Sequence, residues 1–276
     1  MRMIHALCPL FLMLDVAACV PDDAVSFPTA MSLQACDEHI IIADVPPDAA
    51  RRAVDARYTP TINARGQAVG FISTYRCDQV GVGHRDYPAG FLSYFSIVLD
   101  TPPELPQNDD DLHQYVLWAT TNQPAIEQAF TLAGILVDRT DDITLRLDAT
   151  TRNTSVEHGG PVSPFTATTT VEKTFDEPEH EHDFYFWSVG SQGPVGLAAK
   201  MKYGLESVGT VEVQYPSGNR LADFLHGATI RRSIVSQLKG ATGQLMSATT
   251  SAALTTRAFL AGKRSIPRQK AYSHWP

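Results

Sequence analysis

The stretch YVLWATTNQPAIEQAFTLAGILVD, residues 115–138, decides how the rest of the chain is interpreted. Residues 115–121 are apolar and β-favouring, which predicts a strand. Pro124 stands where a first helical turn tolerates proline, and apolar residues follow it at three- and four-residue spacing. Gly134 stands where a helix commonly ends in a left-handed residue. We therefore expect a strand, a short helix and a glycine stop.

Length and composition place the chain among globular proteins. Its 276 residues suffice for one large domain or two small ones, and 43% of them are hydrophobic. After residue 20 no run reaches the roughly 18 apolar residues that a membrane-spanning helix needs. The body of the chain is therefore not expected to cross a membrane several times.

The N-terminus has the pattern of an export signal. Arg2 precedes a mostly apolar run over residues 4–14, and the small residues Ala17 and Ala18 precede Cys19. Residues 16–19 resemble a bacterial lipobox, so we predict a signal peptide over residues 1–19 and a membrane tether through a lipid on Cys19. The protein would then be exported, as a periplasmic protein or a membrane-anchored lipoprotein. Translation from Met31 would instead give a cytoplasmic product.

The remaining organisation is predicted from proline content and charge. Residues 20–37 are interpreted as a tether, residues 38–240 as a single β-barrel-like domain, and residues 241–276 as a basic C-terminal extension. The formal net charge is −8, yet no acidic residue follows Asp223. We expect the basic tail to lie on the acidic body of the protein and do not expect a nucleic-acid partner. The sequence leaves a homo-oligomer open.

Two cysteines remain in the body after Cys8 and Cys19 are assigned to the signal region, namely Cys36 and Cys77. In an oxidising compartment they could form a disulfide, or they could be two unrelated buried thiols. The sequence leaves both alternatives open.

Strands outnumber helices in the predicted elements. A proline-started helix is expected at residues 47–58, and helical spacing over residues 219–239 predicts a second one, with a weak continuation over residues 240–260. The candidate strands cover residues 68–76, 91–100, 115–121, 143–150, 165–173, 184–189, 197–203 and 208–215. So many strands in about 150 residues must fold over or close to cover their edges.

This order of elements resembles the acetoacetate decarboxylase-like superfamily over residues 38–240. The resemblance rests on the helix at residues 47–58, the strands after it, and the strand, helix and Gly134 of the opening stretch. It implies a β-rich α+β fold, a closed antiparallel barrel or cone with a few flanking helices and an apolar cavity for a small keto acid. It also implies a catalytic lysine after the helix, where this chain has Val137 and Asp138. Neither side chain forms a Schiff base.

Five residues form the predicted ligand-binding set. Arg76 ends a predicted strand and carries a guanidinium that matches a carboxylate. Lys200 and Lys202 alternate on a strand and so share a face; one could enter the cavity from across the barrel, or both could lie solvated on the outer face. Tyr115 and Phe130 come from the opening stretch.

Two histidines in an acidic run give a weak signal for a metal. On a strand His180 and His182 would share a face and could bind a divalent ion, but charged runs beside a proline are usually solvated loops. No Gly-x-Ser-x-Gly elbow or phosphate-binding loop occurs in the sequence. We predict no metal and no cofactor.

Two functions follow from these observations. The first is an exported protein that binds a small, largely apolar carbonyl or carboxylate ligand in its barrel, without Schiff-base decarboxylase activity. The alternative is a lyase or hydrolase of the same superfamily that acts on a keto compound through acid and base residues instead of lysine.

Overall fold

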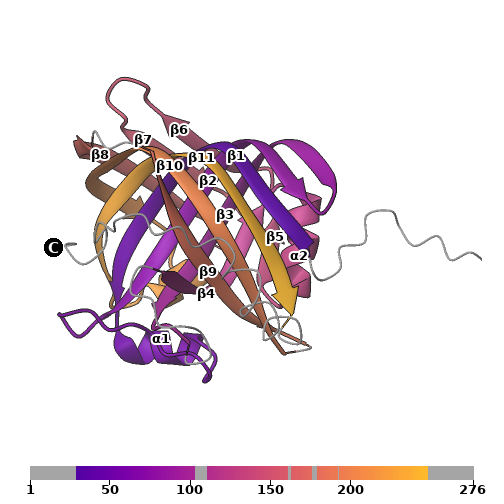
Figure 1. Ribbon diagram of the computed structural model, residues 1–276. Helices are drawn as coiled ribbons and strands as arrows, with labels where there is room; N and C mark the ends of the chain where they lie inside the picture. Colours follow the sequence, from indigo (N-terminus) through magenta and orange to yellow (C-terminus); the bar gives the residue numbers. More distant parts are fainter. Residues whose placement is uncertain (1–28, 103–110, 161–162, 176–178, 192, 248–276) are drawn as a thin grey trace, which may run out of the picture.

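The computed structural model describes residues 29–102, 111–160, 163–175, 179–191 and 193–247 (Figure 1). The helices are α1 (Pro47–Ala53), α2 (Pro124–Leu132) and α3 (Arg220–Phe224). The strands are β1 (Thr29–Val45), β2 (Ala68–Val82), β3 (Arg85–Leu99), β4 (Leu112–Thr121), β5 (Leu136–Arg139), β6 (Ile143–Leu147), β7 (Thr154–His158), β8 (Phe165–Phe175), β9 (His180–Gly190), β10 (Gly193–Gln214) and β11 (Thr229–Ser247). The predicted β-rich α+β class is confirmed.

Seven strands close into a barrel. Neighbours in the sheet follow the order β11-β1-β2-β3-β4-β9-β10, and β10 also pairs with β11, which completes the ring. Closure removes the free edges that an open sheet would expose. The predicted closed barrel is confirmed.

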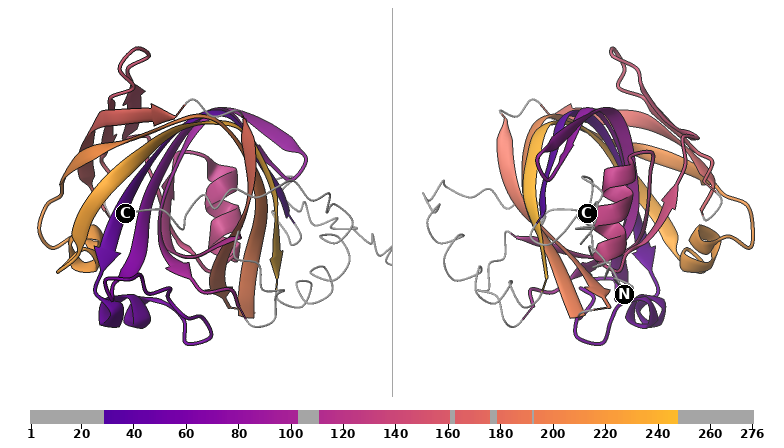
Figure 2. Two further views of the ribbon diagram at one scale, coloured as in Figure 1. Left: turned by 60° about the vertical axis from the view of Figure 1, so that its left-hand side comes forward. Right: turned by 90° about the vertical axis from the view of Figure 1, so that its right-hand side faces the viewer.

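The barrel is not purely antiparallel, which corrects the prediction. The strand β4 runs parallel to both β5 and β9. A parallel neighbour needs a crossover connection, and α2 supplies it between β4 and β5. The stretch over residues 115–138 is therefore a βαβ unit. Figure 2 shows α2 standing within the ring of strands.

The helix α2 forms as the sequence predicts. Pro124 opens it, and its buried residues Ile126, Ala129 and Phe130 join the core inside the barrel. Gly134 has a φ of 76°, and a Cβ there would overlap the Val189 carbonyl of β9. A glycine is needed because the chain must turn left-handed directly against another backbone.

An arm of three strands, β6, β7 and β8, continues the sheet from β10. The outward-facing side chains of β1 and β2, such as Ile41 and Ile72, share a second core with Leu145 and Phe165 of this arm. The wall formed by β1 and β2 therefore carries apolar packing on both faces.

The C-terminal helix predicted over residues 219–239 is wrong. Only Arg220–Phe224 is helical, and β11 then pairs with β1 on one side and β10 on the other. Its β-branched residues, such as Ile234 and Val235, suit a strand, and two neighbouring strands outweigh local helical spacing. Residues 240–247 also belong to β11 and not to a helix or an extension.

The predicted tether also needs correction. Residues 29–37 lie in β1 and pair with both β2 and β11. The signal segment, Cys19 and residues 248–276 lie outside the described residues. No helix in the described part of the chain is long and apolar enough to span a membrane.

Two of the predicted strands are one strand in the structure, and several strands of the structure were not predicted. The candidates at residues 197–203 and 208–215 are parts of the single strand β10, which pairs first with β9 and then with β8. The short strands β5 and β7 and the long strands β1 and β11 were not predicted.

Candidate functional site

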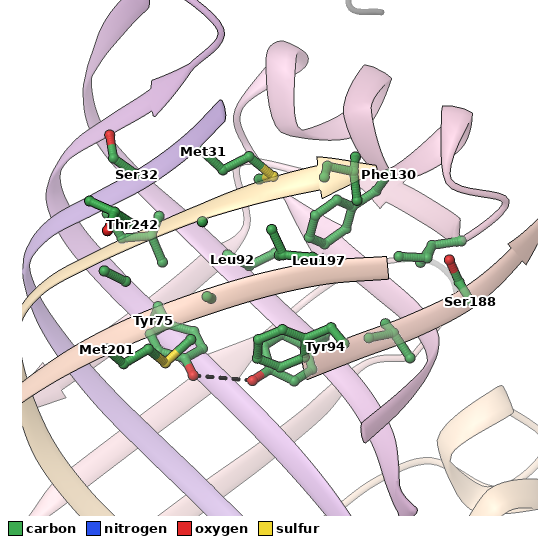
Figure 3. A pocket seen from close by; sticks show the side chains of 18 of the residues that line it. Met31, Ser32, Tyr75, Leu92, Tyr94, Phe130, Ser188, Leu197, Met201 and Thr242 are labelled. Carbon is green, nitrogen blue, oxygen red and sulfur yellow. Dashed lines mark hydrogen bonds between the residues drawn. The ribbon is translucent and has the colours of Figure 1, made fainter. Parts of the chain in front are cut away.

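A cavity of about 60 Å³ lies inside the barrel (Figure 3). Its wall is almost entirely hydrocarbon and includes Leu92, Phe130, Phe186 and Leu245, together with the thioethers of Met31 and Met201. These side chains come from β1, β3, α2, β9, β10 and β11, so the cavity exists only because the ring is closed. An apolar cavity with few polar groups is the usual form of a small-molecule site.

Two of the residues that line this wall are tyrosines. Tyr75 of β2 and Tyr94 of β3 line the cavity, and their hydroxyl oxygens share a hydrogen bond of 3.1 Å (Figure 3). Their rings stack with centroids 5.9 Å apart. Burial raises the pKa of both hydroxyls, so both keep their hydrogens and act as neutral hydrogen-bonding groups.

A buried carboxyl lies next to this pair. Glu38 of β1 is directly opposite Tyr75 in the strand register and only 1% exposed. The Ser236 hydroxyl of β11 donates to its Oε2 at 2.5 Å, whereas Oε1 has no hydrogen-bond partner among the described residues. Burial raises the pKa of Glu38 to about 7, against the lowering effect of the Ser236 hydroxyl. The carboxyl therefore titrates near neutral pH.

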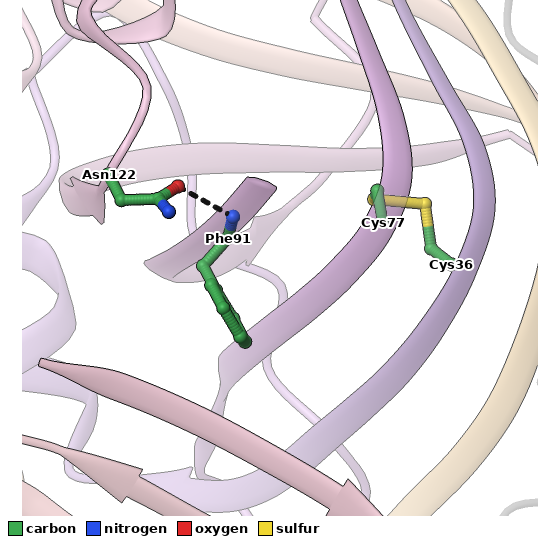
Figure 4. Close-up of a disulfide and its surroundings, with 4 residues drawn as sticks. All are labelled: Cys36, Cys77, Phe91 and Asn122. Carbon is green, nitrogen blue, oxygen red and sulfur yellow. Dashed lines mark hydrogen bonds between the residues drawn. A yellow bond between two sulfur atoms is a disulfide. The ribbon is translucent and has the colours of Figure 1, made fainter. Parts of the chain in front are cut away.

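A disulfide joins β1 and β2 beside this carboxyl (Figure 4). Cys36 and Cys77 are paired across the two strands, with Cα atoms 3.9 Å apart, and both are buried in the core of the barrel. Of the two alternatives that the sequence left open, the structure has the disulfide.

The predicted ligand-binding residues are not brought together. Phe130 lines the cavity. The Arg76 side chain is 45% exposed; it pairs with Asp37 and donates from Nη1 to the Leu145 carbonyl of the arm. Tyr115 packs against Tyr58 in the outer core, with ring centroids 5.5 Å apart. Arg76 and Tyr115 do not line this cavity.

The two candidate lysines lie on the outer face of β10. The side chains of Lys200 and Lys202 are 56% and 47% exposed, and they form ion pairs with Glu181 and Glu179. Strand alternation explains the outcome, because Ala199 and Met201 point inward between them. Every lysine in the described part of the chain is exposed.

The positions expected to hold a lysine in the superfamily lie on β5. Val137 packs against the core of the barrel. Asp138 is half-buried in the same strand. Neither position brings an amine to the cavity.

The histidines of the acidic run lie on β9. His180 Nε2 is 3.3 Å from Glu206 Oε2, and the rings of His180 and His182 are 4.9 Å apart. Within the described ranges, no group of three or more His, Cys, Asp or Glu residues could hold a metal ion.

The sequence interpretation missed Glu38, Tyr75, Tyr94 and Ser236. One signal was available for Glu38, which stands with His39 directly before the apolar run of residues 40–42. A carboxylate next to a run of buried apolar residues is unusual and indicates a buried titratable group. The other three are ordinary strand residues until the barrel brings them together.

The geometry defines a class of fold, that of the acetoacetate decarboxylase-like proteins, and solved structures bear this out. An acetoacetate decarboxylase-like enzyme from Sphingomonas wittichii RW1 matches with a TM-score of 0.52 and 10% identity, over 81% of this chain and 91% of that one. Acetoacetate decarboxylase from Legionella pneumophila matches with a TM-score of 0.52 and 9% identity, over 78% and 84%.

A third neighbour is the enduracididine biosynthesis enzyme MppR complexed with pyruvate. It matches with a TM-score of 0.51 and 15% identity, over 80% of this chain and 88% of that one. No family model matches the sequence, and no curated protein matches it. The chain has the acetoacetate decarboxylase-like fold, as the resemblance implied.

Proposed function

We propose that this protein binds a small, largely apolar carbonyl or carboxylate compound inside its barrel and forms no Schiff base with it. The observation that carries the proposal is the hydrocarbon cavity within the closed ring of strands, which is lined by Tyr75 and Tyr94 with their paired hydroxyls. The hydrocarbon wall favours an apolar body, and the hydroxyls offer hydrogen bonds to one polar group. The complex of MppR with pyruvate supports a small carbonyl ligand for this fold.

A cavity-filling variant tests the binding role. In Ala199→Leu an inward-facing methyl on the cavity wall becomes an isobutyl group that occupies the free space. The matched control is Ala198→Leu, one residue away on the opposite face of the same strand. We expect small ketones and short carboxylates to raise the melting temperature of the wild type and the control but not of Ala199→Leu. Equal shifts in all three proteins would contradict a site in this cavity.

The absence of Schiff-base chemistry has its own test. Each described lysine is exposed, so none offers the buried, neutral amine that the reaction needs. Treatment with borohydride in the presence of acetoacetate should leave the mass of the protein unchanged. A stable adduct on any lysine would overturn this part of the proposal.

We also propose that the protein is exported and tethered through Cys19. The signal pattern of residues 1–19 supports this, and so does the Cys36–Cys77 disulfide, because disulfides persist in oxidising compartments. Mass spectrometry of the mature N-terminus should find a lipidated Cys19. An N-terminus at Met31 would contradict the proposal.

A proton-transfer enzyme is the second candidate. The observation in its favour is Glu38, whose pKa of about 7 suits a group that takes and returns a proton beside the cavity. Such an enzyme would exchange the hydrogens next to a bound carbonyl with solvent. NMR of acetone in D₂O should then show faster exchange with the wild type than with Glu38→Gln. Equal rates would remove this candidate.

A further inference from the structure

The described part of the cavity wall has no positive charge. Of the described side chains that line it, none is lysine, arginine or histidine, and its polar members are Ser32, Tyr75, Tyr94, Ser188 and Thr242. The Ser188 hydroxyl is already engaged, since it donates to the Ala133 carbonyl at 2.7 Å. The ionisable group beside the tyrosines is Glu38, which is an acid.

A carboxylate ligand is therefore disfavoured. Moving a charged group from water into a hydrocarbon cavity costs several kcal/mol unless an opposite charge receives it. In this cavity the ligand charge would meet hydrocarbon, neutral hydroxyls and the like charge of an ionised Glu38. A neutral carbonyl compound avoids both costs.

The volume of the cavity further limits the class of ligand. The cavity of about 60 Å³ is far smaller than the ~150 Å³ of an apolar cavity that holds benzene. This space favours a small carbonyl compound.

Building on the proposed binding role, we infer that the site selects a short neutral ketone or aldehyde over a keto acid, with the carbonyl oxygen accepting a hydrogen bond from the Tyr94 hydroxyl. Tyr94 is the donor because it is farther from Glu38, whose carboxyl interacts with the Tyr75 hydroxyl, and Tyr75 in turn shares a hydrogen bond with Tyr94. Each hydroxyl has one hydrogen, so this chain of hydroxyls can point in either of two directions.

The protonation of Glu38 sets this direction. A neutral Glu38 has a hydrogen to give to Tyr75, Tyr75 then gives its own to Tyr94, and the Tyr94 hydrogen is left for the ligand. An ionised Glu38 accepts from Tyr75 instead, which draws the Tyr94 hydrogen away from the cavity. Binding of a ketone should therefore weaken as Glu38 loses its proton.

Other groups face the Glu38 carboxyl from the surrounding strands. Ser236 of β11 donates to it, and Tyr203 and Glu206 lie on β10. Glu206 is paired with His180 of β9 and acts to raise the pKa of Glu38. The Tyr94 hydroxyl also lies near the Ser73 hydroxyl, which has a hydrogen of its own to give.

The experiment is an NMR titration with 2-butanone labelled at the carbonyl carbon, at pH 5.5, where Glu38 is neutral. We expect saturable binding to the wild type, about tenfold weaker binding to Tyr94→Phe, and unchanged binding to Tyr215→Phe, which alters an exposed tyrosine outside this cavity. Acetoacetate should not displace the ketone. Circular dichroism of each variant verifies that it is folded.

A pH series supplies the second measurement. Binding of 2-butanone to the wild type should weaken as the pH rises through 7, whereas Glu38→Gln, which keeps a donor at every pH, should bind it equally throughout. Binding that does not change with pH in the wild type would overturn the role given to Glu38.

The outcomes separate this inference from the binding role on which it rests. If acetoacetate binds at least as tightly as 2-butanone, or if folded Tyr94→Phe binds the ketone normally, the inference is wrong and the binding role stands. If neither compound binds the wild type at any pH, the proposed function fails as well.

Discussion

At the scale of single residues, Glu38 is the group that most distinguishes the interior of this barrel. The Ser236 hydroxyl donates to its Oε2, and the Tyr75 hydroxyl also interacts with the carboxyl. A buried acid in this setting is stable as the neutral form, because ionisation would leave a charge in a hydrocarbon core. Its proton is therefore part of the folded structure.

Glu38→Gln should change how stability depends on pH. The pKa of Glu38 is about 7 in the folded protein and near 4.5 when the chain is unfolded, so the unfolded chain releases the proton first and stability falls as the pH rises from 4.5 to 7. The loss amounts to roughly 3 kcal/mol. Denaturant unfolding at pH 5 and 8 should show that the wild type and the exposed control Glu212→Gln lose this amount relative to Glu38→Gln, since the buried histidines contribute equally to all three proteins. Parallel pH profiles would contradict the prediction.

The buried histidine His39 should make stability depend on pH in the opposite direction. Its Nε2 is 2.7 Å from the Thr169 hydroxyl, and burial lowers its pKa to about 4. The unfolded chain takes up this proton near pH 6.5, so stability is present above that pH and falls by up to about 3 kcal/mol towards pH 4. His39→Gln should reduce the slope of this part of the unfolding profile, to which His113 and His158 also contribute because burial lowers the pKa of each to about 4, and His226→Gln, at an exposed site, should leave it unchanged. A wild-type slope in His39→Gln would mean that His39 is not among the groups that titrate.

At the scale of elements, Gly134 fixes how α2 meets β9. Gly134 and Gly66 share a φ of 76°, but a Cβ at Gly134 would overlap the Val189 carbonyl, whereas a Cβ at Gly66 would meet open space. Gly66→Ala should lower the free energy of unfolding by about 1 kcal/mol, because alanine is strained in this left-handed backbone conformation. Gly134→Ala should cost at least ~2 kcal/mol more, because β9 must also move. Equal losses of unfolding free energy in the two variants would show that α2 and β9 can move apart without an energetic cost.

The Cys36–Cys77 disulfide should stabilise the pairing of β1 and β2. The two residues are 41 positions apart in the sequence, and closing a loop of this length in the unfolded chain is worth roughly 4 kcal/mol. Replacing both cysteines by serine should lower the free energy of unfolding by about that amount. The wild type in reducing agent is the matched comparison. An unchanged free energy would mean that the disulfide strains the folded barrel as much as it restricts the unfolded chain.

Elements with local signals could be predicted from the sequence, and elements defined by distant partners could not. The helix α2 was predicted because Pro124, its apolar spacing and Gly134 lie within eleven residues. The strand β1 mixes Asp37, Glu38 and His39 with apolar residues, because one face lines the barrel and the other lies under the arm. No local sequence pattern identifies a strand whose two faces pack in two different hydrophobic cores.

The residues of the candidate site follow the same rule: those with a local signal could be predicted, and those brought together by distant strands could not. Phe130 of the recognisable stretch lines the cavity, whereas Arg76 and the two β10 lysines of the predicted set have exposed side chains outside it. Alternation along a strand tells which residues share a face but not which face is inside. That choice depends on the closure of the ring.

At the scale of the whole molecule, β11 completes the ring. It pairs with β1 along one side and β10 along the other, and its residues Ala241 and Leu245 line the cavity. A fragment that ends at residue 225 contains the arm and the other barrel strands but leaves β1 and β10 without this partner. We expect it to lack a cooperative thermal transition and to be cleaved rapidly by protease, unlike the full chain. A cooperative transition in the fragment would show that the rest of the barrel folds without β11.

The seam between β1 and β11 also has a consequence for the timing of synthesis. Thr29 at the start of β1 pairs with Leu245 near the end of β11, so the first strand waits for more than 200 further residues before its partner is made. Ribosomes add about 5 to 20 residues per second, which makes this wait at least ~10 s. During that interval the nascent chain cannot close its barrel. The contacts between β1 and β11 are therefore among the last of the barrel to form during synthesis.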